Sequence, residues 1–200
     1  KADFFAFPDD DCIYEPDTLE KAVGFFRDYP QADAMLGQWC GYDENRFPGD
    51  RPPVPVDRYR CFYRAETFVQ FYRNTPCTAA WRFDPVFGFG EGAIHVASED
   101  TDFLLSLIDA GVLCFRVNSV HIHHHKPNFE GTDAIRTYGY GKARSALLCK
   151  HAMPGLFIAL NLVYPLLRLL MRPDRARHYW AMFRGRRDGY FVKNNRSGTC

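Results

Sequence analysis

The sequence predicts an α/β fold that ends in a helical tail, and three features indicate it. The almost wholly apolar run Ala2–Phe7 has the length and character of a strand buried on both faces, as in a parallel sheet. A helical pattern follows over residues 16–29, and short strand and helix patterns alternate after it. From about Asp133 the pattern is helical only. The chain therefore divides into residues 1–150 and a tail, residues 151–200.

Each element is expected from its local pattern. Pro16 suits a first helical turn, and Asp17 with Glu20 can cap that helix. Its apolar face is formed by Leu19, Ala22, Val23 and Phe26. Strands are expected at 32–42, 56–64 and 112–117, an extended segment at 119–125, and loops at 43–55 and 81–92. Helices are expected at 65–72, from Glu99 to Gly111, and at 137–151, 156–170 and 172–187.

The net charge of +1 conceals two halves of opposite sign. Residues 1–150 hold 16 Lys and Arg against 22 Asp and Glu, whereas residues 151–200 hold nine against two. The tail is also very apolar, which favours an anionic phospholipid surface over nucleic acid as its partner. Its apolar stretch contains Pro165 and Arg168 and is shorter than the roughly 20 residues that cross a bilayer. We therefore expect residues 152–193 to lie on a membrane surface as interfacial helices.

The seven cysteines are odd in number and scattered, and no two form a C-x-x-C pair. This pattern excludes a disulfide framework and a zinc ribbon, and it favours a reducing compartment. The chain has no internal repeat and no low-complexity segment.

Three carboxylates, those of Asp9, Asp10 and Asp11, follow the first strand. Open α/β sheets bind ligands at the carboxyl ends of their strands. Adjacent carboxylates repel one another unless a cation lies among them or water solvates them, and Mg²⁺ or Mn²⁺ prefers such oxygen ligands. From the triplet alone, two interpretations stay open: a divalent metal site, or a solvated acidic turn that caps the next helix.

A second acidic pair, Glu99 and Asp100, begins a helix after a glycine-rich loop. The helix dipole favours acidic residues at this position, which accounts for the pair without any chemistry. The alternative is a carboxylate aimed into a cleft, where it acts as a general base on an acceptor hydroxyl.

Four histidines cluster at positions 121 and 123–125. In an extended segment His121, His123 and His125 share one face. A zinc site would need ligands from another element, whereas one histidine could complete the coordination of a metal held by the aspartates. The candidates for that role are His123 and His125. A polar strand end without a ligand is the equal alternative.

The order of these motifs resembles that of family 2 glycosyltransferases with the GT-A fold, over residues 2–150. The family's Asp-x-Asp motif matches Asp9–Asp11, its Glu-Asp motif matches Glu99–Asp100, and Gly88–Gly92 lies between them. The resemblance implies a partial GT-A fold, a mixed sheet flanked by helices. It also implies metal-dependent, inverting transfer of a sugar from a nucleotide-sugar donor to a hydroxyl of a glycan or lipid-linked acceptor.

The resemblance assigns roles to individual residues. Asp9 and Asp11 hold Mn²⁺ or Mg²⁺, which acts as a Lewis acid on the leaving nucleoside diphosphate. Asp10 and Asp11 lie at the donor diphosphate and sugar, and Asp100 is the general base. The acceptor-binding residues are Trp81, Gly90, Glu91 and Glu99. Trp81 could stack on a sugar face, and a core or membrane-facing tryptophan is the equal alternative.

The chain departs from the family pattern at its start. The family's fold begins with earlier strands and helices that hold the nucleotide, so we expect transfer only with a segment that precedes Lys1. The tail is similar to those of membrane-associated members that build bacterial surface polysaccharides, which implies a cytoplasmic protein on the inner face of the cell membrane. Two rival functions stay open: a metal-dependent phosphoesterase or nucleotide-sugar hydrolase, and a non-catalytic membrane-associated module with a degenerate transferase fold.

Overall fold

A computed structural model of the chain describes residues 2–44, 47–49, 51–88, 93–125 and 134–194, with side chains through Phe191. It contains two compact units, and each is described by itself. Unit 1 comprises residues 1–82 and 103–127, and unit 2 comprises residues 83–102 and 128–200. Compactness alone does not define a functional domain, so the division at residue 150 stays a prediction.

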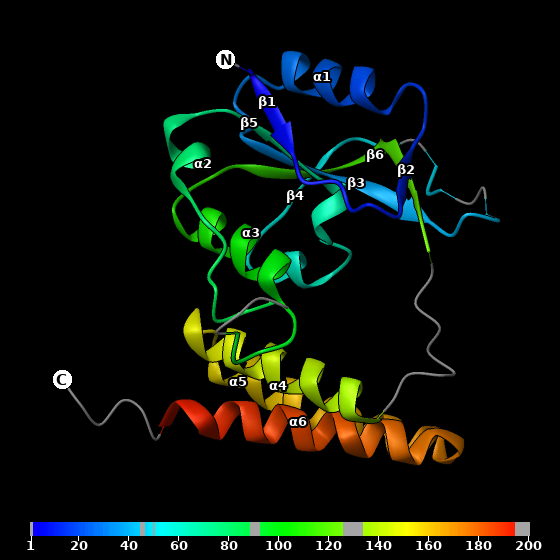
Figure 1. Ribbon diagram of the computed structural model, residues 1–200, viewed down its shortest axis with the longest axis vertical. Coiled ribbons are helices and arrows are strands. Elements are labelled where there is room, and N and C mark those ends of the chain that lie inside the picture. Colours follow the sequence, from blue (N-terminus) through cyan, green and yellow to red (C-terminus); the bar gives the residue numbers. More distant parts are fainter. Residues whose placement is uncertain (1, 45–46, 50, 89–92, 126–133, 195–200) are drawn as a thin grey trace. The chain divides into compact units, whose positions relative to one another are not determined.

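Unit 1 is built on a six-stranded mixed sheet with the strand order β1-β5-β3-β6-β2, in which β4 also pairs with β6 (Figure 1). The strands are β1 (Phe4–Ala6), β2 (Cys12–Tyr14), β3 (Ala34–Cys40), β4 (Val54–Pro55), β5 (Gln70–Arg73) and β6 (Cys114–His124). β3 and β6 pair in parallel, whereas the other pairs are antiparallel. A short helix, α2 (Pro76–Ala80), follows β5. The expected mixed sheet is confirmed.

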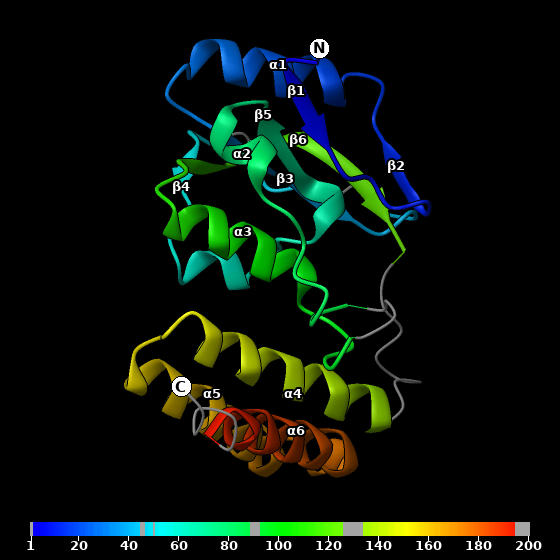
Figure 2. The ribbon, with the colours of Figure 1, turned by 60° about the vertical axis from the view of Figure 1, so that its left-hand side comes forward.

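Helices flank the sheet on both faces, as Figures 1 and 2 show for α1 (Thr18–Asp28) and α3 (Glu99–Asp109). Phe4 stacks on Phe26 of α1, with ring centroids 5.0 Å apart. The next residue, Phe5, stacks on Tyr72, whose ring meets the edge of Phe103 in α3. Neighbouring strand residues point to opposite faces, so this alternation fills the space on each side of the sheet.

The structure corrects four strand and helix predictions in unit 1. β1 lies at an edge of the sheet, antiparallel to β5, rather than between parallel neighbours. Residues 56–64 do not form a strand but contain the 3₁₀ turn η1 (Arg60–Phe62). Residues 65–72 form the turn η2 (Thr67–Val69) and strand β5 rather than a helix. The strand predicted at 112–117 and the extended segment predicted at 119–125 form the single strand β6.

The expected apolar face of α1 is also partly wrong. Leu19 and Val23 are exposed, whereas Phe25 joins Ala22 and Phe26 in the core. Asp17 makes no side-chain cap and instead forms an ion pair with Lys21, at 2.9 Å. The Thr18 hydroxyl donates to the backbone oxygen of His121 at 2.7 Å, which ties the start of α1 to β6.

Unit 2 contains the helices α4 (Ala134–Lys150), α5 (Gly155–Met171) and α6 (Ala176–Asn194), with the turn η3 (Pro173–Arg175) before α6. Glycines let α4 and α6 approach closely. A Cβ atom at Gly185 would overlap the carbonyl oxygen of Tyr138, and one at Gly189 would overlap that of Lys142. Only glycine permits such a crossing. The predicted helical tail is confirmed.

α5 has one polar contact surface and one apolar surface. Asn161 is buried, accepts a hydrogen bond from Arg144 Nε at 3.0 Å and donates one to Ser145 at 3.1 Å, both on α4. The apolar side chains on the other surface are exposed: Leu156, Leu160, Val163, Tyr164, Leu167, Leu170 and Met171. Among the described residues, no single helix has the length and hydropathy of a membrane span, whereas α5 with Pro173–Phe191 meets these criteria as a pair bent by 117°.

Candidate metal centre

The turn that carries the three aspartates crosses one end of the sheet. β1 and β2 follow one another in sequence but lie at opposite ends of the strand order, so residues 7–11 pass the ends of the strands between them (Figure 1). Immediately after this turn, Cys12 pairs with His124 in the antiparallel β2–β6 ladder. This register brings Asp11 beside the last residue of β6.

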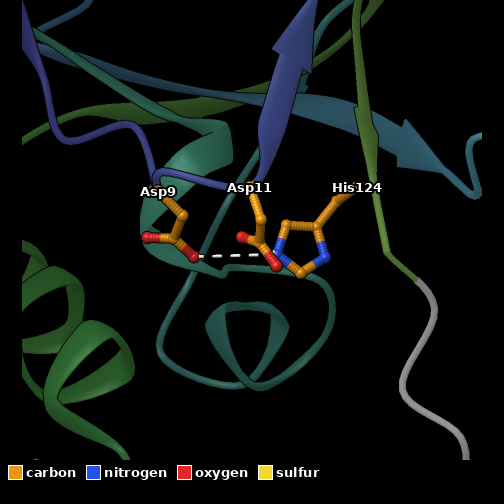
Figure 3. A group of neighbouring side chains, drawn as sticks. All are labelled: Asp9, Asp11 and His124. Carbon is orange, nitrogen blue, oxygen red and sulfur yellow. Dashed lines mark ion pairs between the residues drawn. The ribbon is translucent and has the colours of Figure 1, made fainter.

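Asp9, Asp11 and His124 converge at this point (Figure 3). His124 Nε2 lies 3.1 Å from an oxygen of Asp11 and 3.8 Å from an oxygen of Asp9. One possible ligand atom from each residue lies within 4.8 Å of the other two. The aspartate side chains are 43% and 54% exposed, so the cluster is accessible to a ligand from solvent.

Aromatic packing fixes the His124 ring. Phe68 stacks on it with the ring centroids 4.2 Å apart, and Trp39 meets it edge to face at 5.8 Å. Trp39 is itself held, because its Nε1 donates to the carboxylate of Glu66 at 3.0 Å. The imidazole nitrogen therefore faces the aspartates before any ligand binds.

The cluster is short of positive charge. Burial raises the pKa of Asp9, and the negative charges of Asp11 and Asp10 raise it further, against the lowering effects of His124 and Thr67. A divalent cation would offset that repulsion. Two carboxylate oxygens and one imidazole nitrogen suit Mn²⁺ and are acceptable to Mg²⁺, so the donor set fits the expected metal.

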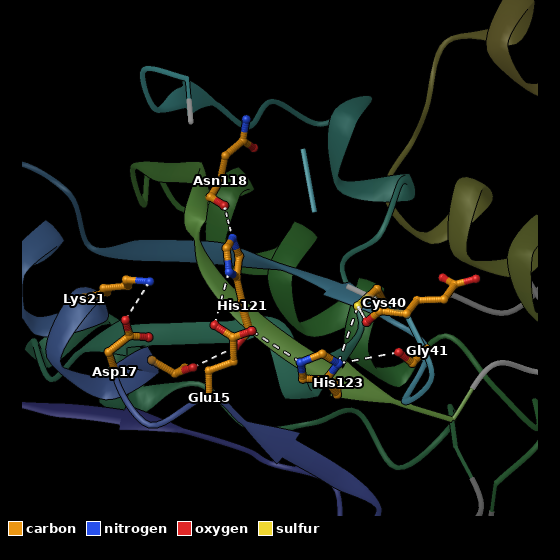
Figure 4. Close-up of polar contacts among 10 residues, drawn as sticks. Glu15, Asp17, Lys21, Cys40, Gly41, Asn118, His121 and His123 are labelled. Carbon is orange, nitrogen blue, oxygen red and sulfur yellow. Dashed lines mark hydrogen bonds and ion pairs between the residues drawn. The ribbon is translucent and has the colours of Figure 1, made fainter. Parts of the chain in front are cut away.

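The structure brings His124, rather than His123 or His125, to the aspartates. By the alternation of a strand, His121 and His123 lie on the opposite face of β6 from His124. There Glu15 Oε2 lies 3.3 Å from His121 Nδ1, and Glu15 Oε1 lies 3.3 Å from His123 Nε2 (Figure 4). His123 Nδ1 also lies 3.5 Å from the sulfur of Cys40. His125 is exposed and stacks with Tyr42 at a centroid distance of 6.2 Å.

A signal for His124 was present in the sequence. Val120 and Ile122 belong to the core. Because a strand has a period of two, His124 continues their face to the end of β6. Extending the apolar alternation by one step identifies it.

The other predicted site residues are divided between the two units. Asp10 is exposed in the same turn as Asp9, and Trp81 follows α2 with 38% of its surface exposed. Asp100 lies in unit 2, at the start of α3, where its carboxylate accepts a hydrogen bond from the backbone nitrogen of Thr101 at 2.7 Å. Glu99 packs beside Gly88, whose φ of 105° requires glycine. Gly90 and Glu91 lie outside the described residues.

A second carboxylate cluster, which the sequence did not predict, lies in unit 2. Asp102 is buried and binds Lys150 Nζ at 2.7 Å and His151 Nε2 at 2.9 Å. Lys150 also reaches Asp84 at 2.8 Å. Burial lowers the pKa of Lys150, but the hydrogen bonds that Lys150 donates to Asp102 and Asp84 outweigh this effect and raise its pKa above the usual value. This cluster holds the first turn of α3 to the end of α4.

Comparison with known proteins gives a likeness to a solved structure. No family model and no curated protein matches the chain. The fold is similar to the crystal structure of S. aureus TarS, a staphylococcal glycosyltransferase, with a TM-score of 0.49 and 15% sequence identity. The likeness covers 91% of this chain and 40% of that chain. A likeness at this level carries no argument about function, so any function must be inferred from the geometry of the site.

Proposed function

We propose that this chain is the metal-binding and acceptor-side part of a glycosyltransferase that uses a nucleotide-sugar donor. One observation carries the proposal: Asp9, Asp11 and His124 converge at the end of a mixed sheet with carboxylate and imidazole atoms turned toward one another. Like-charged, solvent-accessible carboxylates gain most from a divalent cation.

Each residue then has a separate task. Asp9, Asp11 and His124 would hold Mn²⁺ or Mg²⁺. When bound, the cation would neutralise charge on the leaving nucleoside diphosphate. Asp10, in the same turn, would orient the donor.

Asp100 would accept the proton of the acceptor hydroxyl. As that oxygen attacks the anomeric carbon, the bond to the diphosphate breaks on the opposite face, and the configuration inverts. The hydrogen bond that the Asp100 carboxylate accepts from the backbone nitrogen of Thr101 orients this carboxylate before the acceptor binds.

The test uses the full-length protein with UDP-, GDP- and dTDP-linked hexoses and Mg²⁺. Saturation-transfer NMR measures donor binding. This binding should require Mg²⁺, and the affinity for the donor should fall about tenfold or more in Asp11→Asn. Asp100→Asn should keep this binding and lose sugar transfer, whereas Asp28→Asn, an exposed aspartate on α1, should change neither.

Two results would contradict the proposal. Release of free sugar at the same rate with and without acceptor would favour the hydrolase. Donor binding that is absent, or unaffected by Mg²⁺ and by Asp11→Asn, would favour the non-catalytic module.

We also propose that the tail lies on an anionic membrane surface. The exposed apolar side chains of α5 form one continuous face, and the exposed Arg172 and Arg175 lie just beyond it. Apolar burial and attraction between arginine and lipid phosphate act together at such a surface.

Sedimentation with phosphatidylglycerol vesicles tests the membrane proposal. The double variant Leu160→Gln with Leu167→Gln should release the protein, because each change removes an exposed apolar side chain from the bilayer. Leu19→Gln, an exposed leucine of α1, should not. If the double variant sediments with the vesicles as much as the unaltered protein does, α5 is excluded as the membrane contact.

A further inference from the structure

Unit 1 contains a cavity of about 600 Å³ beside β4, where that strand pairs with β6. This volume is within the range of small-molecule sites, roughly 300–1,000 Å³. Twelve residues of the described part of the chain line the cavity, and none of these twelve is acidic. Half of them are arginines and tyrosines: Arg51, Arg60, Arg64, Arg116, Tyr59 and Tyr63.

Arg116 is charged, half-buried and held by carbonyl groups. Its two terminal nitrogens donate to the backbone oxygens of Arg64, at 3.0 Å, and of Tyr63. Burial lowers the pKa of Arg116, and the negative charge of Glu66 opposes this effect. The carboxylate of Glu66 accepts a hydrogen bond from Trp39. A guanidinium has five N–H donors, so two carbonyl contacts leave others for a ligand.

Arg64 and Arg60 repeat this arrangement. Arg64 donates to the backbone oxygen of Trp39 at 3.0 Å, and its φ of 47° is unfavourable for a residue with a side chain. Arg60 donates to the backbone oxygen of Pro55 at 2.8 Å, and its contact with Asp57 is long, at 3.9 Å. Backbone carbonyls orient these guanidinium groups but do not neutralise them.

Tyr63 organises two of the charges. The guanidinium carbons of Arg116 and Arg64 lie 5.7 and 6.0 Å from the centre of its ring. Tyr63 is 65% exposed, so it can contact a ligand as well. A site with oriented guanidinium groups and an accessible ring suits an oxyanion attached to a flat or apolar body.

Trp39 connects this cavity with the candidate metal centre. Its ring lies 5.3 Å from the guanidinium carbon of Arg64 and 5.8 Å from the ring of His124. A ligand bound to Arg64 would therefore be separated from His124 by the side chains of Arg64 and Trp39.

We propose that this arginine pocket binds an anionic group, phosphate or carboxylate, of the acceptor. The acceptor role rests on the proposed function, whereas anion binding by the pocket does not.

Calorimetric titration of the full-length protein tests the pocket with inorganic phosphate, glucuronate and glucose. EDTA removes divalent cations, and the ionic strength is kept at about 0.15 M to screen surface charges. We expect saturable binding of phosphate, glucuronate or both, and none of glucose. Binding of phosphate alone indicates a phosphate-bearing acceptor, and binding of glucuronate alone indicates an acidic sugar.

Variants locate the binding. Arg60→Gln should weaken it about tenfold, the usual loss of one charged hydrogen bond. Arg116→Lys keeps the charge but loses the two-pronged geometry, and it should weaken binding as well. Arg27→Gln, an exposed arginine on α1, is the matched control.

Three results separate the outcomes. No anion binding to the unaltered protein, or equal weakening by Arg27→Gln, would overturn the pocket. Anion binding by a protein that shows no metal-dependent donor binding would retain the pocket and remove its acceptor role.

Discussion

The two carboxylate clusters of this chain differ in burial and in charge balance. Asp102, in unit 2, is buried and meets both Lys150 and His151. Asp9 and Asp11, in unit 1, are exposed, and His124 alone among their described ion-pair partners faces them. The comparison indicates that the buried Asp102 cluster stabilises the fold, whereas the exposed cluster of Asp9 and Asp11 has unused capacity for a cation.

The largest effect is expected at the buried cluster. Asp102→Ala leaves Lys150 and His151 without their shared acceptor, and breaking such a buried network costs about 3–5 kcal/mol. Urea unfolding should show this loss. Asp102→Asn, which keeps the shape of the side chain, should lose less. An unfolding midpoint unchanged by both variants would show that the cluster does not hold α3 to α4.

The exposed cluster should respond in the opposite way. Without metal, Asp9→Asn and Asp11→Asn should keep stability within about 0.5 kcal/mol or raise it slightly, because they relieve repulsion. With Mn²⁺ at about 100 times its dissociation constant, the unaltered protein should gain about 2.7 kcal/mol and the variants much less. Thermal unfolding with and without Mn²⁺ measures both effects. A gain of equal size in all three proteins would place the metal elsewhere.

The smallest effect is a pH dependence at the rim of the buried cluster. The hydrogen bond from Lys150 lowers the pKa of Asp84 in the folded state. Its contribution to stability is therefore present above its unfolded pKa of about 3.9 and is lost as the pH falls through the folded value. The free energy of unfolding should be measured at a series of acid pH values for the Asp84→Asn variant and the unaltered protein. The difference between the two free energies should shrink below about pH 4. A difference that stays constant with pH would exclude this ion pair as a source of stability.

Much of this fold could be predicted from local patterns. The helix at α3, the core strand β3 and the helical tail follow from apolar spacing and helix signals. The predictions for 56–64 and 65–72 were wrong because the aromatic and charged residues there fit the period of a helix and that of a strand equally well. Pairing with β3 and β1 makes part of the second segment a strand.

The candidate sites, too, could be predicted only in part from the sequence. The aspartates stand out in the sequence, and the alternation of Val120 and Ile122 indicates the face on which His124 lies. That His124 meets the aspartates depends on the register of β2 against β6, which no short motif encodes. Asp102 looks like one more acid at a helix start. Its partners Lys150 and His151 lie 48 and 49 residues away, so only the folded chain reveals the buried cluster.

The most direct test of the metal centre is a Mn²⁺ titration followed by electron paramagnetic resonance, with His123 as the matched control for His124. We predict one Mn²⁺ site in the unaltered protein. His124→Ala and Asp11→Asn should weaken it about tenfold or more, while His123→Ala, on the opposite face of β6, should leave it unchanged. Equal weakening by His123→Ala and His124→Ala, or no Mn²⁺ binding at all, would contradict the assignment of this metal centre.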